Sequence, residues 1–348
     1  MRKAGDVGAG GGSGEAGRDA DGRPCDLVLR PVTDADVDVV TGLIAAQDVA
    51  WWGEPDADAD DTRLEFDRVR LAWGSVEAGA RLALLGTVAV GVAMVFDHGQ
   101  TTLAAPPASP DPAVVTHVLL DWLLDHGAES VDAPVDDAVR IGVIEQRGCT
   151  RDRSSFELER SADVGDLGPT AWPDGYVSTP FRPDVDEREL HDMIYSVWTD
   201  VPGHTHRPLE EWRTLLLSGP TFDPDLVVLA RHRGDGAIVV GERGHDGPIA
   251  GVAICRRFGG GVGWVSQLAV ARDHRGVGLG RALLVDAFHR LAARDGTTVI
   301  GLGVEAENAA ALGLYRSVGL DVAREYVHFS TDRRGRRRGA GPGTGPVT

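Results

Sequence analysis

The order of apolar and polar positions repeats along the chain. A short apolar run over residues 27–31 predicts a strand, and residues 34–46, which begin with acidic residues, predict a helix after it. Residues 176–181 predict a second strand of this kind, and residues 186–198 predict a second helix. The chain therefore starts the same strand-then-helix sequence twice.

Both halves continue with further apolar strands. Residues 82–85 and 88–96 predict two neighbouring strands joined by a turn, and residues 226–230 and 249–256 predict their counterparts in the second half. Because the elements recur in the same order, the pattern predicts two copies of one β/α unit.

Changes in composition divide the chain into five segments. Both ends are poor in apolar residues, which is typical of segments without a packed core. The basic end, around Arg333 to Arg338, is consistent with a solvated tail or with a tether to acidic surfaces or nucleic acid. The predicted segments are a glycine-rich tail over 1–25, a first domain over 26–160, a linker over 161–174, a second domain over 175–331 and a basic tail over 332–348.

Charge and residue counts exclude several chemistries. The net charge of −18 disfavours binding to phosphate backbones as the main function. The only lysine is Lys3, so the chain has neither the lysine of a nucleotide-binding P-loop nor a core lysine for a pyridoxal Schiff base.

The cysteines and the apolar runs indicate the compartment. Cys25, Cys149 and Cys255 lie far apart with no C-x-x-C pair, so no zinc site or disulfide framework is indicated. The longest uncharged run, residues 82–96, is shorter than a membrane span and contains two glycines. The first residues lack the apolar core of a signal peptide. We therefore expect a cytoplasmic protein without a membrane partner.

The strongest chemical signal is a glycine-rich segment in the second half. Residues 263–270 predict a strand, residues 282–293 predict a helix, and the segment between them holds three arginines and three glycines. Glycines allow successive N–H groups to point at one spot, and a helix start adds partial positive charge. This arrangement predicts a diphosphate site. The G-x-G-x-G spacing does not match the dinucleotide fingerprint.

Two motifs carry a family resemblance. Arg275 to Gly280 fits [Q/R]-x-x-G-x-[G/A], and Asn308 to Tyr315 fits N-x-x-A-x-x-L-Y at every fixed position. The second half therefore resembles the GNAT (GCN5-related) N-acetyltransferase family. The resemblance implies an α/β (α+β) fold of two tandem GNAT-like units, each a mixed, mostly antiparallel sheet flanked by helices. It also implies acetyl-CoA as co-substrate, bound by Leu268, Ala269, Val270, Arg275, Gly276, Val277, Gly278, Leu279, Gly280, Arg281, Asn308 and Ala311.

The same resemblance implies direct acetyl transfer to a primary amine of a small molecule or peptide. A main-chain N–H near residues 268–270 would stabilise the oxyanion. Tyr315 occupies the position of the family's general acid, and Glu305 is a candidate base. His204, His206 and Trp264 are candidates for the acceptor site. We expect no metal, because the H-x-H pair lacks an evident third ligand, and a monomer or homodimer is compatible with the sequence.

The first copy lacks the diphosphate loop. Its equivalent segment, residues 104–111, contains three prolines and neither glycine nor arginine. We therefore expect a degenerate unit that packs against the second or forms a wall of the acceptor site. A non-catalytic acyl-CoA sensor is the main alternative to an enzyme.

The tandem arrangement resembles the mycothiol synthases, which acetylate a cysteinyl amino-sugar. Their pattern has an acidic residue where this chain has Trp264 and a tyrosine where it has Gly303. These departures favour another amine over the mycothiol precursor, which stays an alternative acceptor.

Overall fold

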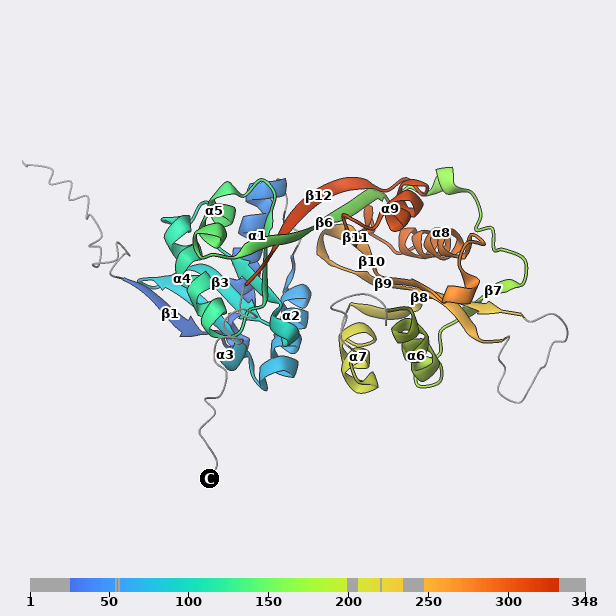
Figure 1. Cartoon of the computed structure of the whole chain (residues 1–348), viewed down its shortest axis with the longest axis horizontal. Helices are drawn as coiled ribbons and strands as arrows, with labels where there is room; N and C mark the ends of the chain where they lie inside the picture. Colours follow the sequence, from blue (N-terminus) through green and yellow to red (C-terminus); the bar gives the residue numbers. More distant parts are fainter. Residues whose placement is uncertain are drawn as a thin grey trace, which may run out of the picture.

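The structure is a computed structural model. It describes residues 26–331, except for residues 54, 56, 199–205, 220 and 234–246. The predicted tails, 1–25 and 332–348, lie outside the described residues. Within the described residues, the strands form a sheet of four and a sheet of eight, with helices packed on both (Figure 1).

The smaller sheet belongs to the first half of the chain. Its order is β1-β2-β3-β4, and every pair in it is antiparallel. Helices α1 and α2 pack on one face, where Leu82 and Met94 are buried, and α4 packs on the other face against Ala93 and Val95. The elements are β1 (Leu27–Pro31), α1 (Val37–Trp52), α2 (Ala59–Trp73), α3 (Val76–Gly79), β2 (Ala80–Leu85), β3 (Val88–Val95), β4 (Thr101–Ala104), α4 (Pro112–Asp125) and α5 (Ala138–Gln146).

The larger sheet contains the second half. Its order is β5-β12-β6-β11-β10-β9-β8-β7, and only β10 and β11 are recorded as a parallel pair. Helices α6 and α7 lie on one face, and α8 and α9 lie on the other (Figure 1). The elements are β5 (Ser130–Pro134), β6 (Thr150–Ser161), β7 (Tyr176–Pro180), α6 (Glu187–Trp198), α7 (Leu209–Leu216), β8 (Phe222–His232), β9 (Ile249–Arg257), β10 (Val262–Val270), α8 (Leu279–Ala292), β11 (Val299–Glu305), α9 (Ala309–Arg316) and β12 (Asp321–Ser330).

The two halves exchange their last strands. Strand β6, which ends the first half, lies between β11 and β12 of the second half. Strand β12, which ends the second half, also pairs with β5 of the first half. Figure 1 shows β6 and β12 running together from one half of the molecule to the other. The halves therefore share a continuous sheet as well as a chain.

The predicted fold class is confirmed: two repeated units form mixed, mostly antiparallel sheets flanked by helices. Element bounds differ most where glycine ends or begins a helix. Helix α8 begins at Leu279 rather than at residue 282, because Gly278, with φ +90°, is its N-cap. Helix α1 extends to Trp52 rather than to residue 46, since the left-handed Gly53 ends it.

Strands β10 and β11 separate along their length. Their parallel pairing runs from Val262 opposite Val299 to Trp264 opposite Gly301 and ends there. A register shift between Val265 and Gln267, a β-bulge or irregularity, lies where the separation begins. The later part of β10 therefore presents main-chain groups toward β11 without a ladder between them.

Candidate active site

The predicted diphosphate loop lies directly beyond the separated end of β10. Gly276 and Gly278 have φ values of +79° and +90°, a left-handed conformation that side chains with a β-carbon rarely adopt. Gly278 is the N-cap of α8, and the first N–H groups of this helix have no intrahelical acceptor. The loop thus has the backbone geometry of an anion cradle at a helix start.

Two contacts hold this loop in place. The Arg275 side chain donates from Nε to the Val270 carbonyl at 3.0 Å, which ties the loop to the end of β10. A β-carbon built at Gly280 would lie 3.3 Å from a methyl group of Leu314, so glycine here allows α8 to approach α9 closely. Arg281 and the half-exposed Val277 complete the surface around the helix start.

The predicted thioester-binding strand has two different faces. Leu268 and Val270 pack against the core beneath α8, whereas Ala269 belongs to the core beneath α6 and α7. This segment lies beyond the last pair of β10 with β11, Trp264 with Gly301, and its edge faces β11. Main-chain groups left without a neighbouring ladder at a strand edge are those to which an extended ligand arm adds as a further strand.

Helix α9 places the second motif on the same side of the sheet as α8. Asn308 caps the helix by accepting a hydrogen bond from the Ala311 N–H at 3.1 Å. Tyr315 is buried in the core that α8 shares with the sheet. Burial raises the pKa of the Tyr315 hydroxyl above its usual value of about 10, so the group is protonated at neutral pH and suited to donating a proton.

Glu305 ends β11 and lies beside a basic side chain of β6. Arg153 donates from Nε to its carboxylate at 3.0 Å, and both side chains are about half exposed. Ile300 and Leu302 point into the α8 core, so alternation along the strand places Gly301, Gly303 and Glu305 on the opposite face. The carboxylate is therefore on the face that carries α6 and α7.

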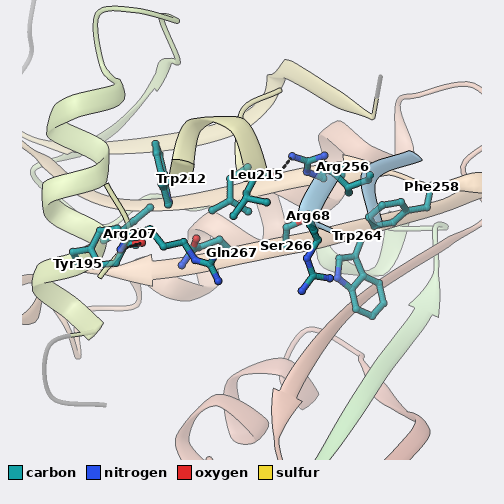
Figure 2. A pocket seen from close by; sticks show the side chains of 13 residues that line it. Arg68, Tyr195, Arg207, Trp212, Leu215, Arg256, Phe258, Trp264, Ser266 and Gln267 are labelled. Atoms are coloured by element: carbon teal, nitrogen blue, oxygen red, sulfur yellow. Dashed lines mark hydrogen bonds between the residues drawn. The ribbon is translucent and has the colours of Figure 1, made fainter. Parts of the chain in front are cut away.

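On that same face lies a cavity of about 350 Å³. Helix α2 of the first half and α7 of the second half both contribute lining residues, and the two helices are in contact (Figure 2). Trp264 of β10, one of the candidates for the acceptor site, lines it beside Ser266 and Gln267 of the same strand. The remaining lining residues are Leu64, Arg68, Ile194, Tyr195, Arg207, Trp212, Leu215, Leu216, Arg256 and Phe258.

The two predicted acceptor histidines have different outcomes. His204 lies outside the described residues. The ring of His206 packs against Tyr195 at 4.3 Å between centroids, and the Tyr195 hydroxyl accepts a hydrogen bond from the Arg207 N–H at 3.0 Å. His206 therefore supports a wall of the cavity through Tyr195, and it is not itself among the lining residues.

Of the residues that line the cavity, sequence reasoning named only Trp264; it missed the others, among them Arg68, Trp212 and Arg256. Arg256 ends an apolar strand beside Arg257, and nothing in the local sequence distinguishes the two arginines. Trp212 lies in an amphipathic helix, where a tryptophan is expected in any packed core. Only the tertiary arrangement brings these side chains together.

No group of three or more histidine, cysteine, aspartate or glutamate side chains is placed to hold a metal ion in the part of the chain that the structure describes. Over the same residues, the helices are too short or too polar to cross a bilayer.

Comparison with known proteins agrees with the geometry. The family model for the acetyltransferase (GNAT) family matches residues 191–320, which contain both motifs, the glycine-rich loop and the one at the start of α9. A mycothiol acetyltransferase from Clavibacter michiganensis is 30% identical over 296 residues, 80% of this chain and 87% of that protein. The chain therefore belongs to the GNAT acetyltransferase family, as the resemblance predicted.

Further relatives are more distant or match in part. A mycothiol acetyltransferase from Kineococcus radiotolerans is 29% identical over 189 residues, and the match spans 56% of that protein. Among solved structures, a GCN5-related N-acetyltransferase from Sphaerobacter thermophilus has a TM-score of 0.67 at 23% identity, covering 88% of this chain and 96% of its own. A tandem GNAT protein from the clavulanic acid biosynthesis pathway has a TM-score of 0.62 at 13% identity, covering 88% and 98%. Both structures share the tandem fold.

Proposed function

We propose that this protein transfers an acetyl group from acetyl-CoA to a primary amine by direct attack. The observation that carries the proposal is the left-handed glycine turn at 276–278, which starts α8 immediately beyond the separated end of β10. A diphosphate on the helix start and an arm along β10 would place a thioester between β10 and β11. The acceptor would approach from the cavity on the opposite face.

Each chemical requirement has a residue nearby. Bound acetyl-CoA supplies a thioester, whose carbonyl carbon the amine attacks while the carbon–sulfur bond breaks. A main-chain N–H near Leu268 to Val270 would stabilise the charge on the carbonyl oxygen. Tyr315 would protonate the departing sulfur, and Glu305 is the candidate base that takes the proton of the amine.

The cofactor-binding residues of this proposal are the two motifs and the end of β10. The positive φ of Gly276 and Gly278 and the bond from Arg275 to Val270 support this choice. The proposed set comprises Leu268, Ala269, Val270, Arg275, Gly276, Val277, Gly278, Leu279, Gly280, Arg281, Asn308 and Ala311.

The first unit is proposed to bind no coenzyme A, because side chains occupy the equivalent cleft. Buried Arg140 donates to the Leu103 carbonyl of β4 and to Gln47 Oε1, the latter at 3.1 Å. Gln47 also accepts from the Ala105 N–H at 3.0 Å. The Leu103 carbonyl and the Ala105 N–H are main-chain groups that an added strand would need. We retain 26–160 and 175–331 as the two domains along the chain, although in space they exchange strands.

A second acceptor, the cysteinyl amino-sugar of mycothiol synthesis, is favoured by the names of the curated relatives. The structure supports a different amine. A β-carbon built at Gly303 would lie 3.9 Å from the Trp264 ring, so the two departures from the mycothiol-synthase pattern are neighbours. The Trp264 ring is thus in van der Waals contact with the point from which a side chain at 303 would extend. An assay of both acceptor types separates the candidates.

Thiol release from acetyl-CoA across a panel of primary amines tests the proposed function and distinguishes an enzyme from a sensor. Replacing Arg275 by alanine should raise the KM for acetyl-CoA about tenfold, because the loop loses its tie to β10 and a nearby positive charge. Arg316→Ala, at the far end of α9, is the matched control and should change KM by less than twofold. An unchanged KM for acetyl-CoA in Arg275→Ala would contradict the assignment of this loop.

A further inference from the structure

The charge of the acceptor cavity is unusual for this acidic protein. Its lining includes Arg68, Arg207 and Arg256, and no aspartate or glutamate is among its lining residues. The chain as a whole has a net charge of −18. The other lining side chains are mainly aromatic and aliphatic (Figure 2). The cavity is therefore apolar with a local excess of positive charge.

Two of the three arginines are neutralised. Arg207 forms an ion pair with Asp97, and Arg68 forms one with Glu65 at 2.9 Å. Arg256 is different: it donates to the Leu215 carbonyl at 2.6 Å and to Thr221 Oγ1 at 2.7 Å, both uncharged. Among the described residues, no carboxylate lies within ion-pair distance of it.

Burial makes this lone charge costly. Arg256 is 2% exposed, and desolvation lowers the pKa of its guanidinium. A charged group taken out of water is destabilising unless an opposite charge compensates it. A ligand anion in the cavity would supply that charge.

A second buried donor belongs to a residue that lines the same cavity, and it has no acceptor within the described residues. The Trp212 side chain is 2% exposed, and its indole N–H has no hydrogen-bond partner within the described part of the chain. Buried donors of this kind are normally satisfied. Trp212 lies one helical turn before Leu215, which accepts the bond from Arg256, so both donors belong to the α7 side of the cavity.

The position of Arg256 gives the length of a ligand that would reach it. Arg256 lies directly opposite Trp264 on the neighbouring strand. Because of the shift between Val265 and Gln267, the distance from Trp264 to Leu268 corresponds to three residue steps on β9, from Arg256 to Ala253, or roughly 10 Å. An acceptor with its amine near the thioester and an anion at Arg256 must therefore be extended by roughly 10 Å, about the length of a tripeptide.

We infer that the acceptor is an extended primary amine with a carboxylate at its far end, seated on the Arg256 guanidinium and the Trp212 indole N–H. This inference rests on the proposed function, because it uses the position of the thioester. The aromatic and aliphatic lining fits an apolar group next to the carboxylate.

The test compares two matched acceptors in the purified full chain. The probes are the tripeptide Gly-Gly-Leu with a free carboxylate and the same tripeptide with a C-terminal amide. We expect kcat/KM for the free acid to exceed that for the amide by about 10- to 100-fold, since a hydrogen-bonded charge pair is formed only with the acid.

Two variants locate the preference. Arg256→Met should reduce the ratio of acid to amide to within about threefold, and Arg257→Met, which removes a charge from the next position, should leave it unchanged. Arg257 instead donates to the Asp295 carbonyl at 2.7 Å. Trp212→Phe keeps the ring and removes only the N–H, and it should lower the ratio about threefold to tenfold. It carries the test where Arg256→Met fails to fold.

Three results would overturn the inference while coenzyme A still binds: equal rates for the two tripeptides, no turnover of the free acid, or an unchanged ratio in a folded Arg256 or Trp212 variant. Each of them leaves the proposed function standing. Failure of the wild-type chain to bind coenzyme A would instead remove the proposed function.

Discussion

We expect coenzyme A affinity to fall by about 100-fold when Gly278 is replaced by valine. Gly278 has φ +90°, and a β-branched residue at this conformation costs roughly 1–3 kcal/mol of backbone strain. The chain relieves the strain by turning the N–H groups at the start of α8, which then no longer converge on one anion. Isothermal titration calorimetry of the variant with coenzyme A measures the loss.

The matched control for this variant is Gly148→Val. Gly148 has φ +78° in the turn between α5 and β6, and no atom lies within 4 Å of a β-carbon built there, as at Gly278. The same strain should lower the thermal stability of both variants, but the control should bind coenzyme A normally. Equal affinity in the two variants would show that the turn at 278 has no part in binding.

We expect turnover to fall by about 100- to 1,000-fold in Tyr315→Phe, with the Kd for coenzyme A changed less than twofold. The change removes only the hydroxyl, so the ring still packs in the core under α8. Because burial raises the pKa of this hydroxyl above its usual value, the wild type keeps the proton throughout the neutral range. Steady-state rates across the neutral range should therefore show no decline due to this group.

Tyr326→Phe makes the identical chemical change at a partly buried tyrosine. Tyr326 lies in β12, its ring packs against Trp52 at 6.0 Å between centroids, and burial also raises the pKa of its hydroxyl. Its kcat should stay within about twofold of the wild type, since α9 and the loop are untouched. A kcat for Tyr315→Phe equal to that of this control would eliminate the general-acid role.

The repeated order of elements was readable from the sequence because it depends on local periodicity. The exchange of β6 and β12 was not, because strand partners are chosen by contacts between distant residues. Leu158 of β6 is fully buried in the core of the second half. However, the alternation of apolar and polar residues in β6 is compatible with a place in either sheet. Hydrophobic patterning determines which face of a strand is buried, but it does not determine which strand lies beside it.

The same distinction applies to the site. Glycine spacing predicted the loop, since the left-handed conformations of Gly276 and Gly278 are a local property of the backbone. The roles inferred for Arg256 and Trp212 depend on a cavity built from α2, α7, β9 and β10, which no local pattern encodes. Trp264 marks the boundary between the two cases: the sequence singled it out, and the structure adds its contact with Gly301, where a β-carbon would lie 2.6 Å from the ring.

The most direct test of the central claim is calorimetric titration of the purified full-length chain with coenzyme A. The loop at 275–281 and the cleft filled by Arg140 in the first unit together predict saturable heat with one molecule bound per chain. Two molecules per chain would contradict the filled cleft of the first unit. Absence of heat with both coenzyme A and acetyl-CoA would contradict the proposed diphosphate site and the transfer reaction built on it.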